Sequence, residues 1–413
     1  MKKQTRVIGI WAVCTAAALC GCSQNEELDE ANQLVDLCIN TSSIALTRAA
    51  GTTGTKVITG EYFAKDAVIA VYAHSSNTNK TSNNHAKFKC TDASSSSSNT
   101  WGYNDGSDKI QLSAEVATIY AVYPDGLTVT TDSGEGVAGD NLKATGVQVF
   151  VGSDTDSENS RIVADATYTS DTPTILAAPG ETDYMYATDG KEGATANAQP
   201  TANNGKSSDT SEGKNPGNSI SLKMNHAMAM VSFKVYNDGT YTHEGKLTKI
   251  QLTNEGSNTS LQLGAMTMNI STGAIEAVTV TSANDATPPT AITRYIYTKG
   301  SGGSGDSSGY TLHQSASGGT AAPDNNPAFS MLVYPITSAI TQNSIKAIFT
   351  VDGNDYPVTI PAESSQTWAA GNNYIYTVKL NGKELAITNV TINKWTDQTI
   401  SGELIPVPKE GSK

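Results

Sequence analysis

Short runs in which apolar and polar residues alternate recur along the chain, and they restrict its fold more than any other feature. A period of two residues is that of a β-strand with one buried face, and Gly, Asn, Asp and Pro separate the runs. Helix-period stretches are hard to find, and only 16% of the residues are charged. Asn381-Gly382, between extended flanks, predicts a tight hairpin with a type I′ turn. We therefore expect an all-β protein of the sandwich class.

The strand-like runs form two blocks, and a polar segment at residues 189–219 separates them. This segment contains almost no large apolar residue and is interpreted as a linker or a long loop. About 390 residues beyond a leader are too many for a single core. We expect two tandem Greek-key β-sandwich domains, at residues 49–215 and 216–395, with long polar loops that include residues 75–100 and 299–325.

The amino terminus has the pattern of an export signal. Three basic residues precede a mainly apolar run from Val7 to Leu19, which as a helix would measure about 20 Å and would not span a bilayer. Such a pattern is typical of a secretory signal. Residues 19–22, Leu-Cys-Gly-Cys, look like a bacterial lipobox. The motif implies that residues 1–21 are removed and that Cys22 carries diacylglycerol on its sulfur and an acyl group on its amine; the alternative is an ordinary signal peptide with an incidental cysteine.

Charge and cysteine content narrow the classes of partner. The chain has a formal net charge of −13, and removal of the basic leader makes it more negative. A charge of this sign repels nucleic acid, so nucleic-acid binding is excluded. After Cys22 only Cys38 and Cys90 remain, too few for a disulfide framework, although they are compatible with one bridge. No later segment approaches 18 consecutive apolar residues, the length that indicates a membrane span.

No constellation of catalytic residues appears, so we expect neither an enzyme nor a cofactor. The histidines are scattered and no nucleophile motif is present. His226 lies in a run patterned for burial, and we interpret it as a hydrogen-bonded core or edge histidine rather than a ligand. Residues 154–165 place acidic side chains at offsets like those of an EF-hand, but Asn159 replaces the required glycine. A solvated acidic loop is the preferred interpretation, with a weak surface calcium site as the alternative.

Several motifs together resemble the lipoprotein-type fimbrillins, subunits of type V pili that include fimbrillin-A-like and Mfa-like proteins. The similarity covers nearly the whole chain and rests on the order and spacing of the motifs, since each one alone is degenerate. The motifs are ATIYAVYP (117–124), DYMYA (183–187), LKMNHAMAMVSFKV (222–235), STGAI (271–275), MLVYP (331–335), WAAGNNYIYTVKL (368–380) and VTINKW (390–395). The resemblance implies transthyretin-like sandwich domains.

The resemblance also implies a route of assembly. Fimbrillins reach the outer membrane as lipoproteins, through the lipoprotein export machinery, and an Arg-specific surface protease then cuts them. Arg48 matches the cleavage position, so that residues 22–48 would be a lipidated propeptide with a leading strand and the mature, extracellular chain would begin at Ala49. A plain surface arginine is the alternative. The chain holds three other arginines, Arg6 in the signal, Arg161 and Arg294, so the cut is nearly unique if the last two lie in structured regions.

Removal of the leading strand would open a groove that another subunit fills with a donor strand. A sandwich that lacks one strand exposes unpaired backbone groups and apolar side chains, which is a template for β-augmentation. In family stalk subunits the donor is the carboxy-terminal tail, here residues 396–413, with Ile400, Leu404 and Val407 as apolar anchors. Pro406 and Pro408 in this tail cannot donate an N–H group.

The tail favours a stalk subunit over a tip or accessory adhesin or an anchor subunit. The partners implied are other copies of the chain or related fimbrillins in a head-to-tail polymer, and an unidentified surface receptor. The alternative from another class is a monomeric surface lipoprotein that keeps its lipid and binds glycan or host protein through its loops.

Overall fold

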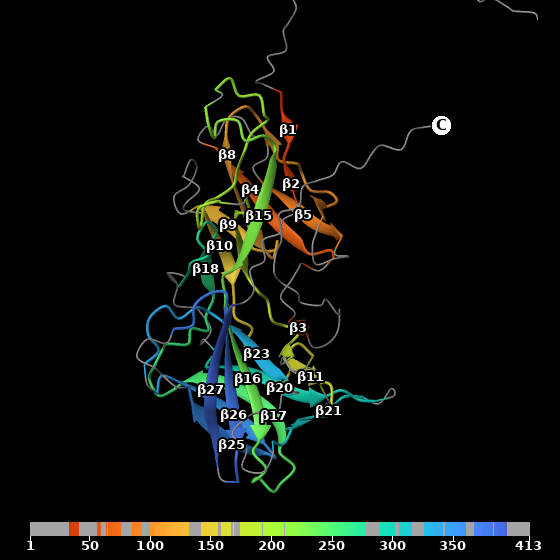
Figure 1. The fold of residues 1–413 in the computed structure, drawn as a ribbon, viewed down its shortest axis with the longest axis vertical. Helices are drawn as coiled ribbons and strands as arrows, with labels where there is room; N and C mark the ends of the chain where they lie inside the picture. Colours follow the sequence, from red (N-terminus) through yellow and green to blue (C-terminus); the bar gives the residue numbers. More distant parts are fainter. Residues whose placement is uncertain are drawn as a thin grey trace, which may run out of the picture.

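The computed structural model describes residues 33–40, 56–58, 63, 65–75, 85–92, 100–131, 142–155, 158–166, 168, 174–191, 193–209, 211–277, 289–301, 305–315, 326–341, 343–360, 367–382 and 384–394. Every regular element among these residues is a β-strand, and the all-β prediction is confirmed. The strands form two lobes that follow one another along the longest axis of the molecule (Figure 1). No helix in the described ranges is long and apolar enough to cross a membrane.

The upper lobe of Figure 1 is built on an eight-stranded sheet. Its strands, in spatial order, are β2 (Cys38–Asn40), β15 (Ser219–His226), β13 (Met185–Asp189), β8 (Ala117–Tyr123), β4 (Val68–His74), β5 (His85–Asp92) and β6 (Thr100–Tyr103), and β14 (Thr201–Ala202) pairs with β8. Two smaller sheets accompany it: β1 (Val35–Asp36) with β7 (Gln111–Leu112), and β19 (Ile275–Ala277), β18 (Met266–Asn269), β10 (Leu142–Val147) and β9 (Thr128–Thr131).

The lower lobe contains two larger sheets. The six-stranded sheet has the order β27 (Leu385–Lys394), β26 (Asn372–Leu380), β16 (Ala229–Asn237), β23 (Ala328–Val333), β12 (Ile175–Ala177) and β3 (Lys56–Ile58). The seven-stranded sheet has the order β11 (Arg161–Ala164), β20 (Ala291–Thr298), β17 (Lys246–Asn254), β24 (Ile345–Val351) and β25 (Asn354–Thr359), with β21 (Ser307–Ser308) beside β20 and β22 (Tyr310–Thr311) beside β17.

Alternation in the sequence places the strands in the core as expected. β24 alternates buried and half-buried residues along its seven positions, whereas β16 and β23 are buried on both faces. The predicted hairpin at Asn381-Gly382 forms between β26 and β27, but the type I′ turn is wrong. The last paired residues are Leu380 and Leu385, and Asn381 N donates to Glu384 O at 3.0 Å. The loop is therefore four residues long.

The two lobes exchange strands across residue 215, where the sequence suggests a boundary. β15, β18 and β19 follow that point in the chain but lie in upper-lobe sheets, while β3, β11 and β12 precede it and lie in lower-lobe sheets. The chain passes between β15 and β16 through Ala227 and Met228, both fully buried. β11 occupies the end of the segment predicted to be a solvated acidic loop, and that part of the prediction is wrong: Arg161–Ala164 pair in parallel with β20.

A buried ion pair joins segments from distant parts of the sequence. Arg294, on β20, donates through Nε to Glu181 Oε1 at 2.8 Å, and both side chains are fully buried. The guanidinium also donates to the carbonyl oxygens of Phe150, at 2.7 Å, and Thr293, at 2.7 Å. Glu181 Oε2 accepts a bond from Leu332 N. Because breaking such a pair leaves an uncompensated buried charge, this network fixes how the segments meet.

Two of the predictions on single residues are settled by the fold. His226 is buried and its Nδ1 lies 2.8 Å from Asp183 Oδ2, so the hydrogen-bonded core histidine is confirmed. Cys38 is exposed, Cys90 is buried, and neither is in a disulfide bond. The alternative of a bridge between them is therefore contradicted.

Candidate functional site

The leading segment, residues 33–40, is held between two parts of the upper lobe that lie far from it in sequence. β1 pairs antiparallel with β7, through Val35 with Leu112 and Asp36 with Gln111. β2 pairs in parallel with β15, through Cys38 with Ser219 and Ile39 with Ile220. Figure 1 shows β1 and β2 beside β15 at the edge of this lobe. We call the place that the segment fills, bounded by β7, β6 and β15, the leading-strand groove.

Apolar side chains of the leading segment enter the core at alternate positions. Leu37 is fully buried and Ile39 is 9% exposed, whereas Leu34 is 43% exposed. Ile110 and Leu112, which lie beside the segment, and Ile220 on β15 are also buried. Burial of a leucine or isoleucine side chain contributes about 1.5–3 kcal/mol. The burial of these side chains therefore holds the segment in the groove.

Backbone hydrogen bonds fix the segment on both sides. Leu37 N donates to Ile110 O at 2.9 Å on the β7 side, and Cys38 N donates to Asn218 O at 2.8 Å on the β15 side. The two bonds leave in opposite directions from neighbouring residues, as the alternation of an extended strand requires. Leu37 therefore marks the point at which the segment changes its partner from β7 to β15.

Side chains of the groove donate to carbonyl oxygens of the leading segment. Asn204 Nδ2 donates to Gln33 O at 2.7 Å, and Asn218 Nδ2 donates to Asp36 O at 2.9 Å. The Tyr103 hydroxyl donates to Leu37 O at 2.9 Å. We refer to Tyr103, Asn204 and Asn218 as the carbonyl donors. They bind main-chain oxygens, which every residue type carries, so they impose no side-chain identity on the strand that they hold.

The loop that carries Asn204 is fixed by its neighbour, Asn203. This side chain is fully buried: its Nδ2 donates to Ala114 O and Lys214 O, each at 3.1 Å, and its Oδ1 accepts bonds from Gly205 N and Gly217 N, each at 3.0 Å. All four hydrogen-bonding positions of the amide are thus used. Of the two interpretations offered for residues 189–219, a long loop is the one that the described part of the segment supports.

Tyr103, Asp36 and Lys109 determine the electrostatics at the groove. Burial, with a further contribution from Asp36, raises the pKa of Tyr103 well above its usual range, so its hydroxyl keeps its proton and remains a donor. Lys109 Nζ lies 2.5 Å from Asp36 Oδ2 and 5.7 Å from the centre of the Tyr103 ring. The Lys109 side chain is 56% exposed, so this pair contributes little stability.

The site residues predicted from the sequence lie outside the described ranges. These are Cys22, Arg48, Ala49, Ile400, Leu404 and Val407. The structure does place the two later arginines. Arg294 is fully buried in β20, and Arg161 lies in β11 with its guanidinium carbon 4.4 Å from the centre of the Tyr297 ring. Both are within paired strands, which is the condition that the uniqueness of an Arg48 cut requires.

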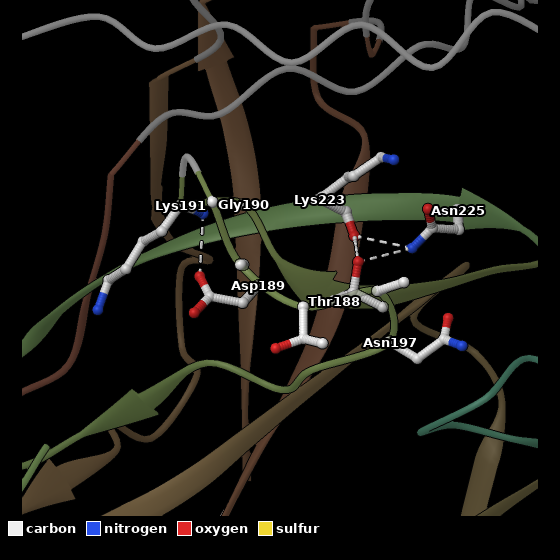
Figure 2. A pocket seen from close by; sticks show the side chains of 11 residues that line it. Thr188, Asp189, Gly190, Lys191, Asn197, Lys223 and Asn225 are labelled. Atoms are coloured by element: carbon white, nitrogen blue, oxygen red, sulfur yellow. Dashed lines mark hydrogen bonds between the residues drawn. The ribbon is translucent and has the colours of Figure 1, made fainter.

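A second concave feature lies on the upper lobe, where the loop after β13 covers part of β15. It is a cavity of about 420 Å³ lined by residues that include Thr188, Lys191 and Lys223. Figure 2 shows that the side chains of Lys191 and Lys223 point away from each other. The Thr188 hydroxyl already accepts a bond from Asn225 Nδ2, at 2.9 Å. Charged groups do not converge here, and no cluster of metal-binding side chains occurs anywhere in the described residues. The leading-strand groove is therefore the candidate site.

The sequence was compared with known protein families. A family model described as fimbrillin-like matches residues 47–395, which is most of the chain. The chain belongs to the fimbrillin-like family. This membership supports a fimbrial subunit that lies at the cell surface and assembles with other fimbrial subunits. A search of curated proteins finds no match.

Solved structures similar to this fimbrillin-like chain are distant in sequence. A cell adhesion candidate from Bacteroides uniformis is 15% identical, with 86% of this chain and 98% of the other covered and a TM-score of 0.44. A cell adhesion candidate from Bacteroides ovatus is 15% identical, with 88% and 99% covered and a TM-score of 0.46. The tip fimbrial protein Mfa3 from Porphyromonas gingivalis is 10% identical, with 87% and 100% covered and a TM-score of 0.35.

The carbonyl donors of this fimbrillin-like chain are the functional residues that sequence reasoning missed. Asn204 and Asn218 lie in the polar segment interpreted as a linker or a long loop, and nothing in a run of Asn, Gly and Ser distinguishes a structural amide from a solvated one. The one available signal was the Asn-Asn-Gly sequence at 203–205, because asparagine followed by glycine favours a turn. Tyr103 carried no signal, since tyrosines are spread over all the strands.

Proposed function

We propose that this chain is a structural subunit of a type V fimbria that polymerises by donor-strand exchange and serves adhesion. It is exported as a lipoprotein with its lipid on Cys22, cut after Arg48 and released as a mature chain that begins at Ala49. The leading segment then leaves the groove, and the tail of another copy, residues 396–413, takes its place. Repeated head to tail, such a contact does not close and grows a fibre.

One observation carries this proposal: residues 33–40 complete the upper lobe by pairing with β7 and with the edge of the eight-stranded sheet. They are joined to this lobe through the chain that follows them. Leu37 and Ile39 fill core positions, and β7 and β15 supply the hydrogen-bonding partners on the two sides. A strand that leaves such a position exposes backbone groups on both neighbours and an apolar strip between them, which another strand can satisfy. The family match begins at residue 47, so this segment precedes the matched region.

Mass spectrometry of the protein recovered from the cell surface tests the processing steps. A mature form that begins at Ala49 supports a polymerising subunit, and a form that begins at acylated Cys22 supports an anchor or a monomeric binding lipoprotein. Electron microscopy of purified protein treated with an Arg-specific protease tests assembly directly. We expect fibres after the cut and none before it. Arg48→Ala should leave the protein in the outer membrane without fibres, and normal fibres from this variant contradict the role of the cut.

A further inference from the structure

We propose that the leading-strand groove takes residues 400–408 of a second copy in the direction and register of the leading segment, with Leu404 in the place of Leu37. In this register Tyr103, Asn204 and Asn218 hold the incoming strand by its carbonyl oxygens. The inference rests on the proposed function and adds to it the orientation of the strand, its register and the groove residues that bind it.

The two sequences share a pattern in this register. The leading segment reads Gln-Leu-Val-Asp-Leu-Cys-Ile-Asn at 33–40, and the tail reads Ile-Ser-Gly-Glu-Leu-Ile-Pro-Val at 400–407. Glu403 then falls at the position of Asp36 and Leu404 at that of Leu37. The fully buried leucine position therefore receives a leucine again, and the acidic position that faces Lys109 Nζ receives a carboxylate again. Pro406 falls at the position of Ile39 and supplies a smaller apolar group there.

The prolines of the tail fit this register because they do not fall at the positions whose N–H groups the groove binds. Outside the strand ladders, the leading segment donates from Leu37 N to Ile110 O and from Cys38 N to Asn218 O. Leu404 and Ile405 stand at these two positions and have N–H groups. Successive N–H groups along a strand point to opposite sides, so the N–H of Ile39 faces away from β15, beyond the end of the β1–β7 ladder at Asp36. A proline at that position loses no ladder bond with β15.

A shift by one residue gives the competing register and conflicts with the groove. That register places Ile405 and Val407, both larger than their proline neighbours, at the positions of Leu37 and Ile39. However, Pro406 then stands at the position of Cys38, whose N–H donates to Asn218 O at 2.8 Å. Proline has no N–H, so the half-buried Asn218 would lose the bond to its carbonyl oxygen. The same shift moves Leu404 to the acidic position beside Lys109.

The carbonyl donors explain how a groove can hold a strand that contains prolines. Three of the bonds to the leading segment run from groove side chains to main-chain oxygens at Gln33, Asp36 and Leu37. Proline keeps its carbonyl oxygen, so none of these bonds depends on the residue type that supplies the acceptor. A proline-containing strand can therefore keep all three of these bonds.

The test measures binding of a fluorescent peptide of residues 399–410 to full-length Leu37→Ala protein that has been cut after Arg48, separated from its released leading peptide by gel filtration and kept dilute. Asn218→Ala and Tyr103→Phe should each weaken binding by about threefold to tenfold, the loss expected for one neutral hydrogen bond. Asn225→Ala is the matched control: this residue lies on β15, the strand that follows Asn218, but its amide donates to Thr188 Oγ1 and Lys223 O, away from the groove. It should leave binding unchanged.

Changes in the peptide test the register. Leu404→Ala should weaken binding by at least about thirtyfold, as removal of a fully buried leucine side chain does, and Ile405→Ala by much less. A peptide with Pro406→Ala should bind no tighter than the natural one. If Pro406→Ala binds tighter and Ile405→Ala is the more damaging change, the shifted register is correct and the inference is overturned.

The experiments distinguish an error in the role of the carbonyl donors from an error in the proposed fimbrial function. If the cut protein forms fibres and binds the peptide, but the donor variants bind it as well as the Asn225→Ala control does, the carbonyl donors play no part and the inference is wrong while the fimbrial role stands. If the cut protein neither binds the peptide nor forms fibres, the donor role of the tail fails, and the inference fails with it.

Discussion

Leu37 gives the sharpest quantitative test of the leading-strand groove. Its side chain is fully buried in a segment held by two short ladders, so Leu37→Ala removes core contacts and leaves a cavity. Such a change costs about 2–5 kcal/mol. Leu34→Ala is the matched control, because Leu34 lies in the same segment but is 43% exposed, and substitutions at exposed positions change stability by about 0.5 kcal/mol or less.

A cut after Arg48 makes this loss of free energy measurable as a weaker affinity of the leading peptide for the groove. In the uncut chain the segment is covalently joined to the lobe that it completes, and its effective concentration at the groove is on the order of millimolar. After the cut only non-covalent contacts hold it. A loss of about 2–5 kcal/mol corresponds to a fall in affinity of about thirtyfold to several thousandfold. Cut Leu37→Ala protein should therefore release its leading peptide while cut Leu34→Ala protein still retains it.

The assay is gel filtration of the cut proteins at matched concentrations, with mass spectrometry to find the leading peptide in each fraction. Denaturant unfolding of the uncut variants supplies the stability change independently. We expect Leu37→Ala protein to form fibres sooner after the cut, since its groove empties sooner. If Leu37→Ala and Leu34→Ala proteins unfold at the same denaturant concentration and release the peptide equally, the segment is not held by its buried side chains and the reasoning fails.

Three further predictions concern the rest of the chain. Deletion of residues 396–413 should leave a folded subunit, by circular dichroism, that does not extend fibres after the cut; fibres of normal length would show that another segment is the donor. Cys22→Ser should abolish incorporation of radiolabelled palmitate and move the protein out of the outer-membrane fraction, and unchanged labelling would exclude Cys22 as the lipidated residue. Arg294→Ala should lower the free energy of unfolding by about 3–5 kcal/mol because it leaves Glu181 charged and buried, whereas Arg161→Ala, which removes a cation–π contact, should cost about 0.5–1 kcal/mol; equal losses in denaturant unfolding would refute the difference.

The alternation of apolar and polar residues was enough to predict the fold class and several strands. It works because a strand that buries one face must repeat with a period of two, which is a property of neighbouring residues. IKAIFTV at 345–351 becomes β24 and SISLKMNH at 219–226 becomes β15 for this reason, and both strands alternate buried and half-buried residues. His226 was likewise predicted to be a buried, hydrogen-bonded residue from the pattern around it. Turn chemistry was less reliable, as the four-residue loop at Asn381 shows, because cross-strand packing also sets the loop length.

Pairing between distant segments was decided only by the tertiary structure. The amide of Asn204 reaches Gln33 across 171 residues of sequence, and Arg294 meets Glu181 across 113. Neither contact leaves a local pattern, because each side chain could equally face solvent in its own stretch of chain. The exchange of β3, β11, β12, β15, β18 and β19 between the lobes has the same origin: periodicity fixes which face of a strand is buried, but the choice of neighbour depends on how all the strands pack together. The sequence by itself determined which segments form strands and which of their faces are buried. The packing of segments that are distant in the sequence decided which of them form the groove.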